Sequence, residues 1–115
     1  MTNATTPEIS VRYEGPGIST EIWAMTQANF MVMVPGHHAK EAAIALNDEA
    51  AKYLADQLGR EDTADNRQVL ARDAGAYILK KRATAGGHTD SVTTVSVALL
   101  GQHPELVDYL KSIEA

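Results

Sequence analysis

The segment that most constrains the fold runs from residue 30 to residue 58, where an apolar run precedes a tight turn and an alanine-rich stretch. Residues 28–34 are apolar at all but one position, which is typical of a strand covered on both faces. Pro35 and Gly36 then form a turn, and six apolar residues of 39–58 share one broad arc of a helical wheel: Ala43, Leu46, Ala50, Ala51, Leu54 and Leu58. We therefore predict a central strand that leads through this turn into the principal helix.

One polar residue interrupts the apolar arc of that predicted helix. Asn47 falls between alanine and leucine positions that we expect to be buried. We interpret it as a partly exposed or hydrogen-bonded asparagine at a helix–helix contact, and the alternative is a polar contact that sets the register or touches a ligand. Gly59 is expected to end the helix.

The residues before the central strand predict two further strands. Residues 1–7 are small and polar and are expected to form a disordered tail. Residues 9–13 alternate apolar and polar side chains, as a half-covered strand does, and 14–17 form a turn rich in Gly and Pro. Residues 19–25 predict a second strand, with a helical turn as the competing interpretation. Short connections between three strands favour an antiparallel meander.

The second half of the chain predicts two helices with an ambiguous segment between them. A short polar connection favours an antiparallel helix pair, and the second helix is expected to end near Arg82. Its apolar residues lie on more than one side, so we expect contacts with the first helix and with the sheet or a partner. Residues 91–100 favour a strand, and a helix ending at Gly101 is the alternative. Pro104 is expected to begin a short final helix. The candidate N-caps of the second helix are Asp62, Thr63 and Asp65.

Together these elements predict an α+β fold. We expect a small, mainly antiparallel N-terminal sheet packed by an antiparallel helix pair and a short C-terminal helix, all in one domain of residues 8–115. A chain of 115 residues can bury a sizeable core, and its lack of cysteine excludes a disulfide scaffold and a thiol nucleophile. We expect a cytoplasmic protein without a membrane segment, because no apolar run approaches about 18 residues.

Histidines and acidic residues near predicted loops form the first candidate site. His37, His38 and Glu41 follow the Pro-Gly turn, and His88 and Asp90 lie in a Gly-rich segment that could fold over them. Such a cluster could bind a small ligand or an anion at the helix start, or supply a general base. A divalent metal would use His38, Glu41 and His88, but no known ligand spacing is present, so we predict no metal and no cofactor.

Basic residues of the second predicted helix form the other candidate site. They could contact phosphates, although cations in the last turn of a helix commonly complement its dipole. The net charge of −5 argues against nucleic acid, and Tyr77 is the single aromatic residue of the segment. The candidates are Arg67, Arg72, Lys80, Lys81 and Arg82.

The function that these patterns favour is protein–protein binding. The chain lacks catalytic spacing, and its predicted helices are apolar on more than one side. We therefore predict a small interaction or regulatory protein without catalysis that binds another protein or a second copy of itself. The alternatives are a ligand- or metal-binding protein or small hydrolase using the histidine cluster, and a nucleic-acid-binding protein using the basic helix.

Overall fold

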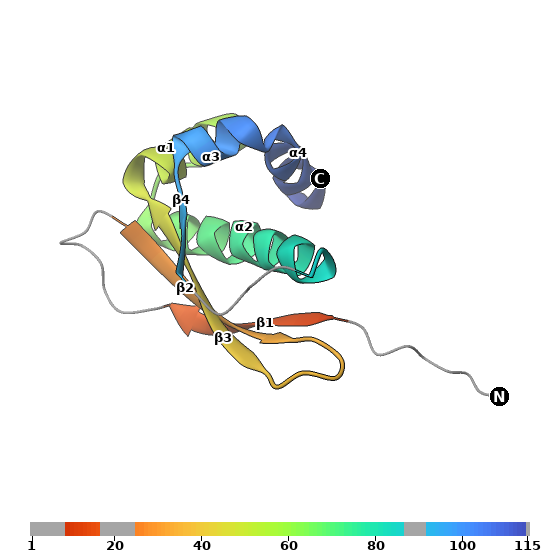
Figure 1. Cartoon of the computed structure of the whole chain (residues 1–115). Coiled ribbons are helices and arrows are strands. Elements are labelled where there is room, and N and C mark those ends of the chain that lie inside the picture. The colour runs from red at the N-terminus through yellow and green to blue at the C-terminus, as the bar shows by residue number, and fades with distance from the viewer. Residues whose placement is uncertain (1–8, 17–24, 87–91, 115) are drawn as a thin grey trace.

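The computed structural model describes residues 9–16, 25–86 and 92–114, and in this part of the chain strands and helices form an α+β fold (Figure 1). The predicted tail of residues 1–7 lies outside the described residues, and so does the predicted strand at 19–25 except for its last residue. In chain order the elements are β1 (Ser10–Pro16), β2 (Met25–Met33), β3 (Lys40–Asn47), α1 (Asp48–Leu58), α2 (Ala64–Thr84), β4 (Val92–Val95), α3 (Val97–Gln102) and α4 (Pro104–Glu114).

The sheet is mixed and mostly antiparallel, as predicted. Its strands lie in the order β1-β2-β3-β4. The first two pairings are antiparallel, with Ser10 opposite Met33 and Met25 opposite Asn47. The last strand pairs parallel to β3, with Val95 opposite Leu46. The C-terminal half of the chain thus completes the predicted N-terminal sheet through β4, which lies in the segment 91–100 that favoured a strand.

The largest correction concerns residues 40–47, which form β3 and not the first half of a long helix. Ala42, Ile44 and Leu46 are buried in the core cluster, while on the other face Glu41 is exposed, Ala43 is half-buried and Ala45 is buried outside that cluster. An alanine-rich segment has a high helix propensity, but pairing with strands on both sides satisfies its backbone and buries these side chains. Tertiary pairing therefore outweighs the local preference.

Asn47 has a different role from the one predicted. It is the N-cap of α1, and its side-chain oxygen accepts a hydrogen bond of 2.8 Å from the backbone N–H of Ala50. The polar residue that interrupted the apolar arc therefore marks the point where strand changes to helix. Asp48 and Glu49 follow in the first turn, where negative charge suits the helix dipole. Gly59, with φ of 66°, ends α1 as predicted.

Replacing Asn47 by alanine is expected to lower the free energy of unfolding by about 1 kcal/mol, because the N–H of Ala50 loses its acceptor. Urea denaturation monitored by circular dichroism measures this change. Asn47→Asp retains a capping oxygen and should stay close to the wild-type stability. Equal losses in the two variants would contradict the capping role.

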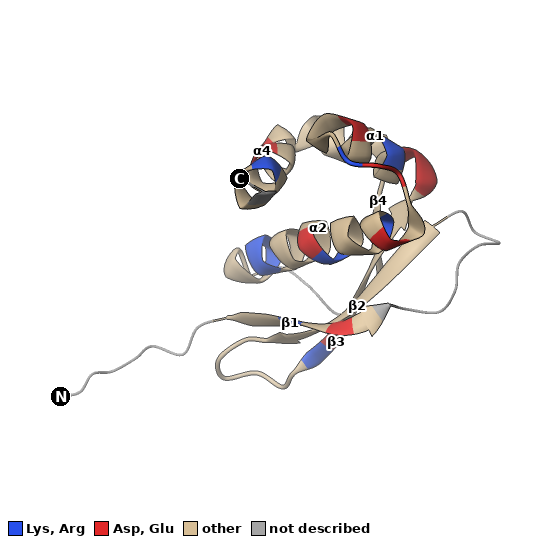
Figure 2. Ribbon diagram, turned by 180° about the vertical axis from the view of Figure 1, so that it is seen from behind, with Lys and Arg blue, Asp and Glu red and all other residues tan. Residues whose placement is uncertain are grey.

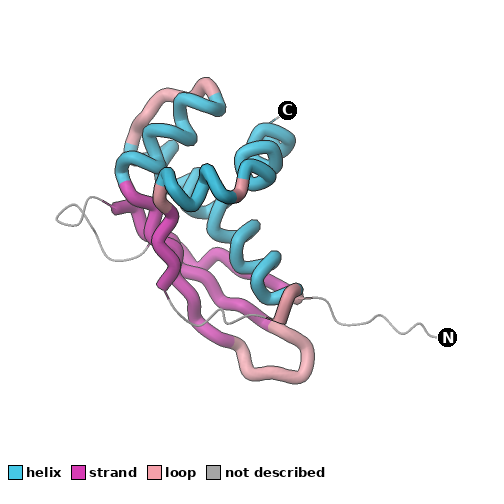
Figure 3. The backbone as a smooth tube through the Cα atoms, turned by 45° about the horizontal axis from the view of Figure 1, so that its top comes forward, coloured by secondary structure: helices cyan, strands magenta, loops and turns pink. Residues whose placement is uncertain are grey.

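Helix α2 covers the sheet and joins it to the other helices. It contacts β1, β2 and β3 on one side and α1 and α4 elsewhere, which confirms the prediction from its scattered apolar residues. Figure 3 shows the helices gathered on one side of the sheet. At Gly75 the helix comes so close to the sheet that an added Cβ would lie 2.7 Å from the ring of Phe30 and 2.8 Å from Ile44. Its N-cap is Thr63, one of the three predicted candidates.

The ambiguous segment 91–100 contains both of the predicted structures in succession. Val92–Val95 form β4, and after Ser96, which caps the next helix, Val97–Gln102 form α3. The final helix begins at Pro104 as predicted. Among the described residues, none of the helices is long and apolar enough to span a membrane.

Candidate functional site

The Pro-Gly-His-His segment is the connection of a β-hairpin and not the start of a helix. It links β2 to β3 and projects away from the helices (Figures 1 and 3). The N–H of His37 donates to the carbonyl oxygen of Val34 at 3.0 Å, closing the turn. His37, His38 and Glu41 are all exposed. The expected anion site at a helix N-terminus is therefore wrong for these residues, and the helical spacing assumed for the histidines and Glu41 does not apply.

Three members of the candidate ligand cluster, His37, His38 and Glu41, belong to the described residues. His88 and Asp90 lie outside the described residues, so their approach to the hairpin stays a prediction. Within residues 9–16, 25–86 and 92–114, no three His, Cys, Asp or Glu side chains gather closely enough to hold a metal ion. Metal binding by His38, Glu41 and His88 also stays untested.

The candidate basic residues are spread along α2 and do different things. Basic residues, blue on the ribbon of Figure 2, occur near the start of this helix and again in its last turns. Residues 67 and 81 are separated by about 20 Å along the axis, at about 1.5 Å per residue. Arg67 has a structural role: its Nε and Nη2 donate to the two oxygens of Asp62, at 2.6 and 2.9 Å, and its Nη1 donates to Asp48 at 2.6 Å. The hydrogen bond from Arg67 lowers the pKa of Asp62. This fork connects the starts of α1 and α2.

Three of the other four basic candidates also have partners nearby. Arg72 pairs with Asp73 at 3.0 Å, and Arg82 donates to the hydroxyl of Thr93 in β4 at 2.6 Å. Lys81 pairs with Glu105 of α4 at 2.9 Å. Lys80 differs, because its ammonium has neither an ion pair nor a side-chain hydrogen bond with the described residues. The basic residues are therefore not one phosphate-binding surface, and Lys80 is the one of these five candidates without such a partner in the described part of the chain.

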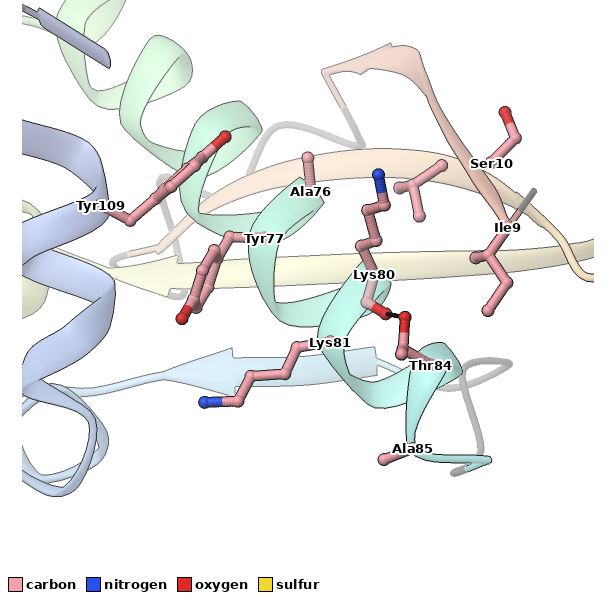
Figure 4. Close-up of a pocket in the computed structure, with 10 residues that line it drawn as sticks. Ile9, Ser10, Ala76, Tyr77, Lys80, Lys81, Thr84, Ala85 and Tyr109 are labelled. Atoms are coloured by element: carbon pink, nitrogen blue, oxygen red, sulfur yellow. Dashed lines mark hydrogen bonds between the residues drawn. The ribbon is translucent and has the colours of Figure 1, made fainter. Parts of the chain in front are cut away.

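Among the described residues, β1, α2 and α4 form a groove of about 920 Å³, which we call the β1–α2–α4 groove. Figure 4 shows α2 in the middle, with Ile9 and Ser10 beside one flank and Tyr109 of α4 beside the other (Figure 4). The groove is mainly apolar, with lysines at its rim. The residues that line it are Ile9, Ser10, Val11, Ala76, Tyr77, Lys80, Lys81, Thr84, Ala85 and Tyr109.

The α4 side of the groove is held by an aromatic pair and an ion pair. The rings of Tyr77 and Tyr109 lie 4.7 Å apart between centroids, and the ammonium of Lys81 lies 5.7 Å from the Tyr77 ring centroid. The hydrogen bond that Lys81 donates to Glu105 lowers the pKa of this carboxyl to about 2 and raises the pKa of the lysine. Lys81 therefore already has an ion-pair partner on the α4 side of the groove.

The β1 side of the groove is open and apolar. Ile9 and Val11 are half-buried and pack against the core, and Ser10 lies at the outer strand between them. Ala76 of α2 and Ala85, the C-cap residue that follows it, have small side chains, which leave space between the larger side chains that line the groove. Figure 4 shows the side chain of Lys80 rising between Ala76 and Ile9 (Figure 4). This side can therefore accept apolar groups and one negative charge.

A second, smaller pocket of about 240 Å³ lies between α2 and the junction of α3 and α4. His103 lies there with its Nδ1 3.1 Å from an oxygen of Glu105. Such a pair could orient a histidine as a general base. However, none of the described residues that line this pocket is a serine, threonine or cysteine, so they offer no such nucleophile to activate. Its lining residues are Tyr77, Ile78, Lys81, Arg82, Ala85, Leu99, His103, Glu105 and Leu106.

The chain matches no protein-family model, and comparisons with curated proteins and with solved structures give no significant match. The function of the β1–α2–α4 groove is therefore inferred from the geometry of the groove alone. Sequence patterns singled out Lys80 and Lys81 but missed Ile9, Val11 and Tyr109, which complete the groove. In the sequence, the one hint of this role is a tyrosine at position 109 within the amphipathic helix α4. Its exposure becomes known only from the structure.

Proposed function

We propose that this chain is a small cytoplasmic interaction or regulatory protein, and that it acts by binding a segment of another protein in the β1–α2–α4 groove. The observation that carries the proposal is the composition of this groove, in which two tyrosines and aliphatic side chains lie beside Lys80, a lysine with no ion-pair partner among the described residues. Tyrosines are enriched in protein interfaces because they bury a large apolar area and keep a polar end.

The shape of the groove favours a polypeptide over a small molecule. Pockets for small molecules enclose most of the ligand surface and have volumes of about 300–1,000 Å³. The β1–α2–α4 groove has a volume of about 920 Å³ but has exposed residues along its length, among them Lys80, Thr84 and Tyr109. A compact ligand would stay largely in water there, whereas an extended chain would contact both walls.

The other candidate functions have less support from the described residues. Nucleic-acid binding needs several free cations, but Arg67, Arg72 and Lys81 are paired with carboxylates and the chain carries a net charge of −5. A metal or hydrolase site would need His88 or Asp90 to approach His37 and His38. Protein binding through the groove needs only side chains whose arrangement is described.

Photo-crosslinking in the native host cells tests the proposal. The photoreactive residue p-benzoylphenylalanine would replace Tyr109 in the groove or, as a control, Tyr53 on α1; these tyrosines are 37% and 36% exposed. We expect discrete crosslinked proteins from position 109 that are absent from position 53. The same bands from both positions, or none from position 109, would contradict binding in the groove. A band of twice the chain mass would identify a second copy as the partner.

A further inference from the structure

The outer edge of β1 has one half that is closed to further pairing and one half that is open. Among the described strands, β1 pairs with β2 alone. Its register shifts between Tyr13 and Gly15, and the strand ends at Pro16. A bulge and a proline are two devices that stop an edge strand from pairing with another chain. Residues 10–13 contain neither device, and no other described strand pairs with their outward backbone groups.

The open half of this edge is the part of β1 that borders the β1–α2–α4 groove. Ile9 and Val11 face α2, and Ser10 between them also lines the groove, so the groove extends to the edge of the strand. A chain added to this edge would lie about 4.8 Å from β1 and would direct every second side chain toward α2. The small side chain of Ala76 leaves space for such side chains next to Tyr77.

The charge beside this edge favours an acidic occupant. Lys80 lies on the side of α2 that faces Ile9 in Figure 4, and its ammonium has no carboxylate partner among the residues that the structure describes (Figure 4). Lys81, one position further, is already neutralised by Glu105. An aspartate or glutamate of the bound segment would therefore meet Lys80 with no competing pair to break.

We propose that the groove binds an extended, acidic segment of a partner protein, which adds as a fifth strand along residues 10–13 of β1. This inference rests on the proposed function and deepens it. Backbone hydrogen bonds to β1 hold the segment in its register. Alternate apolar side chains enter the space between Ile9 and Tyr77, and an acidic side chain pairs with Lys80.

A library of short random peptides displayed on phage, selected against the full-length protein, tests this inference. We expect the selected peptides to alternate apolar residues and to carry Asp or Glu. Lys80→Glu should weaken their binding about tenfold, whereas Lys52→Glu, an equivalent charge reversal on the exposed face of α1, should not. Peptides without acidic residues, or with equal affinity for the two variants, would overturn the charge assignment.

Hydrogen exchange of the complex with a selected peptide tests the strand addition. The outward amides of residues 10–13 should exchange about tenfold more slowly in the complex, while the amides of β4, at the opposite edge, stay unchanged. Peptides that compete with groove crosslinking but leave these amides unprotected would overturn the strand addition and leave the proposed function intact. If no peptide can be selected that slows the hydrogen exchange of amides in the groove, the extended-segment inference is wrong. Crosslinking from position 109 would then still test the proposed function.

Discussion

Gly75→Val is expected to lower the free energy of unfolding by about 3 kcal/mol, because α2 crosses the sheet at this residue without space for a side chain. An added Cβ would lie 2.7 Å from Cε1 of Phe30 and 2.8 Å from Cγ1 of Ile44, and both of these side chains are fully buried. Since neither side chain can move into solvent, the helix must shift away from the sheet and loosen the core around it. Urea denaturation of the purified variant measures the loss.

The chain provides a matched control at Gly101. This glycine is also helical, but an added Cβ there would meet nothing within 4 Å. Gly101→Val is therefore expected to change the stability by no more than about 0.5 kcal/mol, since valine and glycine differ little in helix propensity. Similar losses at the two positions would mean that helix propensity, and not contact with the sheet, makes Gly75 necessary.

Ala42→Gln is expected to cost about 3 kcal/mol, because it would bury a larger, polar side chain in the core. Ala42 is 5% exposed and belongs to the buried cluster that includes Phe30 and Ile44. Its neighbour Ala43 is half-buried on the opposite face of β3, where it borders a shallow hollow of about 290 Å³. Ala43→Gln should therefore stay within about 0.5 kcal/mol of the wild type. Thermal and urea denaturation of the two variants gives both values.

This pair of variants distinguishes the strand from the helix that the local sequence favours. In a helix continuing to Leu58, Ala43 would lie at the centre of the apolar arc with Leu54, and Ala42 would lie outside it. The helix therefore predicts the opposite order of stabilities. A greater loss for Ala43→Gln than for Ala42→Gln would contradict the strand assignment of residues 40–47.

The candidate site was less predictable than the fold. The sequence predicted a candidate site at the basic residues in the last turns of α2, and two of these residues, Lys80 and Lys81, line the groove. Ile9 and Tyr109, however, come from opposite ends of the described chain. Only the placement of β1 and α4 on either side of α2 shows that they belong to one surface. The histidines were prominent in the sequence, but the described ones do not gather.

The sequence by itself determined the class of fold and the elements with unambiguous local signals. These elements are the strand around Phe30, the helix α2, the end of α1 at Gly59 and the start of α4 at Pro104. For α2 the sequence offered three N-cap candidates, of which the structure uses Thr63. Their signals are short-range, because a cap or an alternating apolar pattern acts within a few residues.

Only the tertiary structure decided which of residues 30–58 form strands and which form a helix. Alanine-rich residues 40–47 satisfy a helical pattern and a strand pattern almost equally well, so nearby residues cannot choose between them. Two distant features favour the strand over the helix at residues 40–47. Strand β4, more than forty positions further along the chain, pairs with the side of β3 that β2 leaves free. Gly75 lets α2 come close to Ile44 of β3. Asn47 then capped a shorter helix. Long-range hydrogen bonding and core packing thus outweighed the local preference for helix.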